Sequence, residues 1–165
     1  MTFPKPIPSI LNEYYGNPVS DGYGQHSGFW ETDNLTRVVP PYLMEWAWDG
    51  TTVKRIAIHR KCAPSLLRVL QAIGKRYNQA EIQKYELHRC GGGFNFRAQT
   101  GDKNKLSIHS WGAAFDLAPS ANPYNKAWTD GMIPLEVVAL FKAEGWRWGG
   151  DFVKHPDCMH FQATL

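Results

Sequence analysis

Apolar residues recur at helical spacing in one long stretch of the chain and gather in short runs elsewhere. Between Pro64 and Asn78 they stand three and four positions apart, at Leu66, Leu67, Leu70, Ile73 and Tyr77. This spacing predicts an amphipathic helix that begins near Pro64, a residue suited to a first helical turn, and ends near Asn78. A second helix is predicted after Pro134, with Gly145 as its end signal.

Short runs rich in β-branched and aromatic residues predict the strands. They occupy residues 51–59, 85–88, 113–117, 146–148 and 157–162. Polar segments at 99–105 and 120–130 are predicted to be loops between them. We therefore expect the apolar stripe of the first helix to face a sheet.

Residues 1–50 are punctuated by Gly, Pro and aromatic residues too often for long elements, in groups such as Gly22-Tyr23-Gly24. We expect them to form an arm of turns that packs through its aromatic side chains on a domain formed by residues 51–165. Trp46 and Trp48 are interpreted as packing residues of this arm rather than as a surface on which a ligand stacks.

Composition excludes several classes of protein. A chain of 165 residues with a mean hydropathy of -0.41 fits one globular domain. The net charge of +3 is small and dispersed, unlike that of a nucleic-acid-binding surface. No segment approaches the roughly 20 apolar residues that cross a bilayer, and the first residues lack the apolar run of a secretion signal. The three cysteines, Cys62, Cys90 and Cys158, are odd in number and widely spaced, so we expect them to be reduced and buried.

The chemistry of the chain centres on the stretch from Leu106 to Leu117. It contains His109 and Asp116, with Ser110-Trp111-Gly112 as a predicted turn before a short buried strand. A turn followed by a strand can bring an imidazole and a carboxylate to one point, where both are ordinary ligands of zinc. An unpaired carboxylate in a buried strand would be costly, and a metal ion offsets that cost.

A second pair near the C-terminus completes the predicted site. Asp157 and His160 stand three apart beside the last predicted strand. With His109 and Asp116, His160 gives three protein ligands, which leaves a fourth zinc position for water, as in catalytic zinc sites. Asp157 remains as the base that takes a proton from that water. Arg97 follows three glycines and precedes the first ligand, and it is assigned to stabilise the oxyanion.

Two spaced motifs resemble those of the M15 zinc peptidases. They are Ser107-x-His109-x-x-Gly112-x-Ala114-x-Asp116 and, further on, Trp148-Gly149-Gly150-Asp151-Phe152 with Asp157-x-x-His160-Phe161-Gln162. The family includes D-alanyl-D-alanine carboxypeptidases and dipeptidases, and the L-alanyl-D-glutamate endopeptidases of bacteria and of bacteriophage lysins. The resemblance extends over residues 53–162 and leaves the first fifty residues without a counterpart.

The resemblance implies both a fold and roles for single residues. The implied fold is α+β, with a small antiparallel sheet, helices packed on one side and zinc at the sheet face, as in the D-Ala-D-Ala peptidases and the hedgehog domains. His109, Asp116 and His160 match the zinc ligands of the family. Asp157 matches its catalytic acidic residue, and Arg97 matches the arginine that steadies the tetrahedral intermediate.

The implied function is hydrolysis of an amide in the peptidoglycan stem peptide. Asp157 and the Trp-Gly-Gly-Asp segment before it resemble the endopeptidase branch more than the dipeptidase branch, which favours the bond between L-Ala and D-Glu. A D-Ala-D-Ala carboxypeptidase and a non-catalytic, zinc-containing binding module remain as alternatives. We expect a monomer whose partner is the stem peptide, with no nucleic-acid or stable membrane binding. It would be a phage or prophage lysin, made in the cytoplasm and released to the wall.

Overall fold

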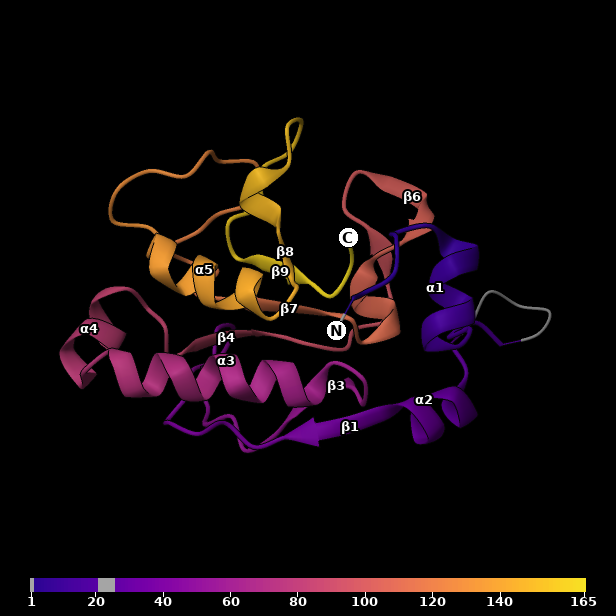
Figure 1. The fold of residues 1–165 in the computed structure, drawn as a ribbon, viewed down its shortest axis with the longest axis horizontal. Coiled ribbons are helices and arrows are strands. Elements are labelled where there is room, and N and C mark those ends of the chain that lie inside the picture. The colour runs from indigo at the N-terminus through magenta and orange to yellow at the C-terminus, as the bar shows by residue number, and fades with distance from the viewer. Residues whose placement is uncertain (1, 21–25) are drawn as a thin grey trace.

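A five-stranded sheet lies at the centre of the protein, for which a computed structural model describes residues 2–20 and 26–165 (Figure 1). The strands in spatial order are β2 (Glu45–Trp46), β4 (Arg89–Gly92), β7 (Ala114–Leu117), β9 (His160–Gln162) and β8 (Arg147–Trp148). The α+β class is confirmed. The expectation of a wholly antiparallel sheet is wrong, because β2 runs parallel to β4. The chain between these two strands includes a long helical crossover, the kind of connection that parallel strands require.

Two helices cover one face of this sheet. α3 (Ala63–Arg76) packs against α5 (Leu135–Ala143), and both lie in front of β4, β7 and β9 in Figure 1. The apolar stripe of α3 is buried, as its spacing predicts. Phe141 of α5 stacks on Phe161 of β9, with ring centroids 3.7 Å apart. Both predicted helices are confirmed, and their burial fixes the strands that carry the candidate site.

The first fifty residues form helices and strands of their own. α1 (Pro8–Tyr15) and α2 (Gly28–Asn34) precede β1 (Leu35–Val38), which pairs antiparallel with β3 (Ile56–His59) in a two-stranded sheet. The prediction of turns alone is wrong here, because Pro8 stands at the start of α1, where its missing N–H and fixed φ favour a helix. The predicted Gly22–Gly24 turn lies outside the described residues.

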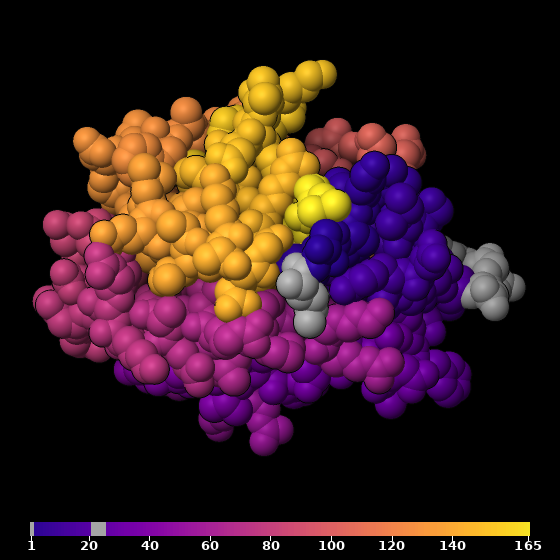
Figure 2. All heavy atoms as spheres, in the orientation of Figure 1, coloured from indigo at the N-terminus to yellow at the C-terminus, as the bar shows by residue number. Residues whose placement is uncertain are grey.

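The N-terminal residues are tied to the other end of the chain. The hydroxyl of Tyr15 donates to the carbonyl of Ala163 at 2.6 Å, and the N–H of Leu165 donates to the carbonyl of Pro4 at 2.9 Å. Figure 2 shows the indigo N-terminal atoms packed against the yellow C-terminal ones. The buried side chains of this region include Phe3, Leu11, Tyr15 and Trp30. The division of the chain at residue 50 stays a prediction.

Three predictions of strands and loops need correction. The strand expected at 85–88 begins at Arg89 instead, because α4 (Gln79–Lys84) fills the space before it. Asn78 and Glu81 form a capping box at the start of α4, in which each side chain accepts the backbone N–H of the other residue. This sequence signature was not used in the prediction. The strand at 51–59 is confined to β3, and the loop at 99–105 is a hairpin of β5 (Ala98–Gln99) and β6 (Asp102–Leu106).

Side-chain exposure tests the predictions that came from composition. The three cysteines are free and buried, as expected. Trp46 is partly buried against the core, whereas 65% of the surface of Trp48 is exposed, so the packing interpretation is wrong for Trp48. None of the described helices combines the length and the apolarity needed to span a bilayer.

His59, at the end of β3, is a neutral histidine inside the core. Its Nδ1 accepts the N–H of Lys61 at 3.1 Å, and its Nε2 lies 3.1 Å from the carbonyl of Tyr15, to which it donates. Burial lowers the pKa of His59 from 6.5 to about 4, against the opposing effect of the bond to Tyr15. Protonation would remove the acceptor that Lys61 uses and place a charge in an apolar site.

We therefore expect His59 to make the fold sensitive to acid. The unfolded chain binds this proton at higher pH than the folded one. The contribution of neutral His59 to the free energy of unfolding is therefore complete above pH 6.5 and is lost as the pH falls toward 4. Between pH 7 and pH 4.5, the free energy of unfolding of the wild type should fall about 2 to 3 kcal/mol more than that of His59→Gln. Urea unfolding at the two pH values measures this difference, and equal losses in both proteins would contradict it.

Candidate metal centre and active site

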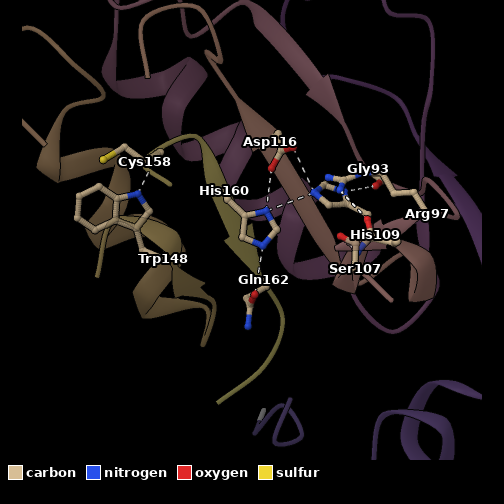
Figure 3. Close-up of polar contacts among 10 residues, drawn as sticks. Gly93, Arg97, Ser107, His109, Asp116, Trp148, Cys158, His160 and Gln162 are labelled. Carbon is tan, nitrogen blue, oxygen red and sulfur yellow. Dashed lines mark hydrogen bonds and ion pairs between the residues drawn. The ribbon is translucent and has the colours of Figure 1, made fainter. Parts of the chain in front are cut away.

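Three side chains from separate elements converge on one point (Figure 3). His109 belongs to the 3-10 helix η1 (Ile108–Trp111), Asp116 to β7 and His160 to β9. Asp116 and His160 are register partners on neighbouring antiparallel strands, so their side chains leave the same face of the sheet. Gly112 adopts a left-handed φ of 60° and ends η1, which turns the chain from His109 into β7.

The distances among the three groups are those of a shared ligand. His109 Nε2 lies 3.3 Å from His160 Nδ1 and 3.2 Å from Asp116 Oδ2, and His160 Nδ1 lies 2.9 Å from Asp116 Oδ1. In a tetrahedral zinc site with bonds of 2.0–2.1 Å, ligand atoms stand about 3.3 Å apart. The donor set therefore fits a tetrahedral metal ion, and the structure brings together all three residues that the sequence assigned as ligands.

Hydrogen bonds on the far side of each ring select the nitrogen that faces the centre. His109 Nδ1 donates to the carbonyl of Gly93 at 2.6 Å, and His160 Nε2 donates to Gln162 Oε1 at 3.1 Å. Gln162 is itself held, since its Nε2 donates to Thr164 Oγ1 at 2.5 Å. With both ring protons engaged, the two nitrogens that face each other carry lone pairs. Two lone pairs and a carboxylate at this spacing are stabilised by a cation between them.

The pKa shifts of the cluster follow from burial and charge. Burial would raise the pKa of Asp116, but His109 and His160 outweigh it and hold that pKa well below its usual range. Burial would lower the pKa of His160, but the hydrogen bond and negative charge of Asp116 outweigh it and raise that pKa. The centre is thus built to hold Asp116 as a carboxylate and to favour positive charge opposite it.

Asp157 lies beside this centre in a tightly fixed loop. Its N–H donates to the carbonyl of Gly149 at 2.9 Å, and its own carbonyl accepts the N–H of His160 at 3.0 Å. A Cβ at Gly149 would lie 2.4 Å from the carbonyl oxygen of Asp157 and 3.1 Å from the Cβ of His160, so only glycine permits this approach.

The carboxyl of Asp157 is free to exchange a proton. Its Oδ1 is buried and has no hydrogen-bond partner among the described residues. Burial is the main cause that raises the pKa of Asp157; the charge of Asp116 also raises it, while His160, His109 and Arg97 oppose the rise. A carboxyl group with an unpartnered oxygen and a raised pKa beside a metal centre is suited to general acid–base chemistry.

Arg97 stands where two cavities meet. Its backbone is fixed by Ser110, whose Oγ accepts the N–H of Arg97 at 3.1 Å and donates to its carbonyl at 2.9 Å. A cavity of about 400 Å³ on one side is lined by Arg97, Asp157 and His160, and a smaller one of about 210 Å³ is lined by Arg97, His109 and Asp116. The metal centre therefore opens to both cavities, and a substrate can extend in two directions from it.

Several residues of the site were not predicted from the sequence. Gln162 and Gly93 orient the two histidines, Ser110 fixes Arg97, and Pro8 and Leu11 from α1 help to line the larger cavity. The spacing of Gln162, two residues after His160 on one strand, places both side chains on the same face and could have indicated its role. No short sequence pattern indicates the roles of the other four residues, because their contacts join parts of the chain that are distant in sequence.

We expect removal of the Gln162 acceptor to weaken metal binding. Without Oε1, His160 loses the bond that fixes its tautomer, so Gln162→Leu should lower the affinity for Zn²⁺ about 10- to 100-fold. Gln162→Glu keeps an acceptor at the same place and should stay close to the wild type. Competition with a chromophoric chelator measures the affinity, and circular dichroism verifies the fold. A leucine variant that binds Zn²⁺ as tightly as the wild type would refute this role.

Comparison with known proteins shows that part of the chain is similar to one peptidase family. Residues 100–163 match the sequence model of an M15 peptidase family described as D-alanyl-D-alanine carboxypeptidase. The matched segment contains His109, Asp116, Asp157 and His160, and Arg97 stands just before it. No curated protein and no solved structure matches the chain. Residues 100–163 are therefore similar to the M15 peptidases, and this similarity together with the His/Asp/His group supports a metal-dependent peptidase.

Proposed function

We propose that the protein is a zinc-dependent peptidase that hydrolyses the amide between L-Ala and D-Glu in the peptidoglycan stem peptide. The observation that carries the proposal is the convergence of His109, Asp116 and His160 between two cavities, with Asp157 and Arg97 beside them. This set contains a metal-binding triad, a proton carrier and a cationic donor, which are the groups that metal-assisted amide hydrolysis needs.

Each residue has a distinct part in the reaction. A bound zinc ion would polarise the scissile carbonyl and lower the pKa of a water molecule toward about 7. Asp157 would accept a proton from the attacking water and pass it to the leaving amine, since its Oδ1 has no other described partner. The guanidinium of Arg97 would donate to the carbonyl oxygen as negative charge develops there, an effect commonly worth about 10²- to 10³-fold in rate.

Two basic side chains and one carboxyl group line the larger cavity, a balance that supports an acidic peptide as ligand. Arg97 and Lys105 both line it, and the chain carries a net charge of +3. Lys105 also pairs with Asp102 at 3.2 Å on the exposed β6 strand. Positive charge on this side would favour the carboxylates of D-Glu and of the residues beyond it. The proposed substrate is therefore a stem peptide whose acidic part occupies the larger cavity.

Two alternatives lead to different products. A D-Ala-D-Ala carboxypeptidase is favoured by the description of the matched family and would release free D-Ala. A binding module that holds zinc without catalysis would release nothing. The unpartnered Asp157 Oδ1 favours catalysis, because a buried carboxylate without a function would carry only its desolvation cost. The monomeric state stays a prediction. So does the role of a phage or prophage lysin that is made in the cytoplasm and reaches the wall.

Substitution of Asp157 tests the assignment of the base. Asp157→Ala removes the proton carrier and leaves the three metal-binding side chains in place, so hydrolysis of purified peptidoglycan should fall at least about 10²-fold while Zn²⁺ stays bound. Asp33→Ala, at an exposed position of α2, serves as the matched control and should behave as the wild type. If the Asp157 variant releases wall fragments at the wild-type rate, the assignment is wrong.

Mass spectrometry of the released fragments tests the bond. Cleavage between L-Ala and D-Glu should leave L-Ala on the glycan and produce peptides with D-Glu at their amino end. A chelator should abolish this release, and added Zn²⁺ should restore it. Free D-Ala as the main product would identify the carboxypeptidase instead, and an absence of products with the zinc-loaded protein would favour the binding module.

A further inference from the structure

Two stacked indole rings border the smaller cavity. The rings of Trp46 and Trp48 lie with centroids 4.6 Å apart and planes inclined by 17°. Trp46 packs partly on the core, whereas Trp48 leaves 65% of its surface exposed. Both residues line the cavity that also contains His109 and Asp116. A partly exposed aromatic pair thus lines the same cavity as two of the three candidate metal ligands.

The turn that carries the pair is held rigidly. Trp46 donates its N–H to the carbonyl of Thr51 at 2.8 Å and accepts the N–H of Gly50 at 2.9 Å. Asp49 Oδ1 accepts the N–H of Thr51 at 2.8 Å, which closes the turn. These bonds fix the backbone of the segment 46–51, and the stacking keeps the Trp48 ring against Trp46, so a ligand would pay little entropy to order the pair.

The same turn is fastened to the central sheet by Arg89 on β4. The guanidinium of Arg89 donates to Glu45 Oε2 at 2.9 Å and to the carbonyl of Ala47 at 3.2 Å. The N–H of Ala47 donates to the carbonyl of Cys90 at 2.9 Å. These bonds set the position of the pair relative to the strand Arg89–Gly92, whose neighbour β7 carries Asp116. The core does not require Trp48, so its placement there needs another explanation.

The lining of the smaller cavity matches a ring with one apolar face and polar edges. The indole pair offers a flat apolar surface, the glycines 91–93 add lining without side chains, and Asn95 and Arg97 supply polar groups. A pyranose has this character, since its axial C–H bonds form an apolar face and its hydroxyl and acetamido groups form a polar rim. A carboxylate-rich peptide lacks such a face.

We propose that Trp46 and Trp48 form a saccharide subsite that binds the glycan sugar to which the stem peptide is attached. The inference rests on the proposed function and deepens it, because this sugar is linked directly to L-Ala. A sugar in the smaller cavity places the L-Ala–D-Glu amide at the metal centre and the acidic part of the peptide in the larger cavity. The D-Ala end of the stem peptide lies several residues from the sugar, and each residue of extended chain adds up to about 3.3–3.6 Å.

The test compares two substrates that differ only in the sugar. One is a disaccharide-linked stem peptide, and the other is the same peptide with an acetylated L-Ala, which keeps the neutral amide. For the wild type, kcat/KM should be higher with the disaccharide. In Trp48→Ala the ratio of the two kcat/KM values should fall about 10-fold, while Trp48→Phe, which keeps a flat aromatic face, should retain most of it. Phe29→Ala removes an exposed aromatic residue of α2 outside both cavities and should leave the ratio unchanged.

Equilibrium binding separates this inference from the proposed function. Calorimetry with the zinc-loaded Asp157→Ala protein should give a tighter Kd for the disaccharide-linked peptide than for the acetylated peptide, and Trp48→Ala in that background should remove the difference. If the wild type cleaves neither substrate, the proposed function fails, and the binding measurement still decides the subsite. An equal loss with both ligands would assign the indole pair to the peptide, and no loss with either would leave it without a role in binding; both outcomes overturn the proposal.

Discussion

Asp116 and His160 stand opposite each other on β7 and β9, and the candidate site depends on this cross-strand pair. The backbone ladder sets the distance between the two side chains, and the sheet buries His160 and leaves Asp116 only partly exposed. His109 joins them because η1 ends at a left-handed glycine immediately before β7. Two imidazole lone pairs and a carboxylate at this spacing are stabilised by a cation between them, and the fold assembles this ligand set before the metal arrives.

The close packing of the backbone around this pair explains the glycines of the region. A Cβ at Gly91 would lie 2.7 Å from the Cβ of Asp116, and one at Gly93 would lie 2.3 Å from the carbonyl of Ala57. Gly93 also presents its carbonyl to His109 Nδ1. Gly91 therefore lets β4 approach Asp116 on β7, Gly93 lets the chain approach β3, and both line the smaller cavity without a side chain. The same small residues serve metal orientation and access for a ligand.

The site extends beyond the segment that matches the M15 family. Residues 100–163 supply the metal-binding triad and Asp157, whereas Arg97, Trp46 and Trp48 and the helix α1 all precede this segment. α1 is held against the C-terminal end by Tyr15 and Pro4, so one wall of the larger cavity depends on contacts between the two ends of the chain. Substrate preference is therefore expected to depend on these walls as well as on the metal centre.

The sequence by itself determined the ligand types, their order and the main helices. His109, Asp116 and His160 could be assigned because metal ligands must be His, Asp or similar residues, and because short motifs keep their spacing within one turn or strand. The helices α3 and α5 followed from apolar periodicity, which is local. The sequence could not indicate that β2 is parallel to β4, that residues 85–88 precede a strand rather than form one, or that Trp48 lies exposed beside the site. Those features, together with the roles of Gln162 and Gly93, were decided by the tertiary structure, because each arises from a contact or register that only the packed chain establishes.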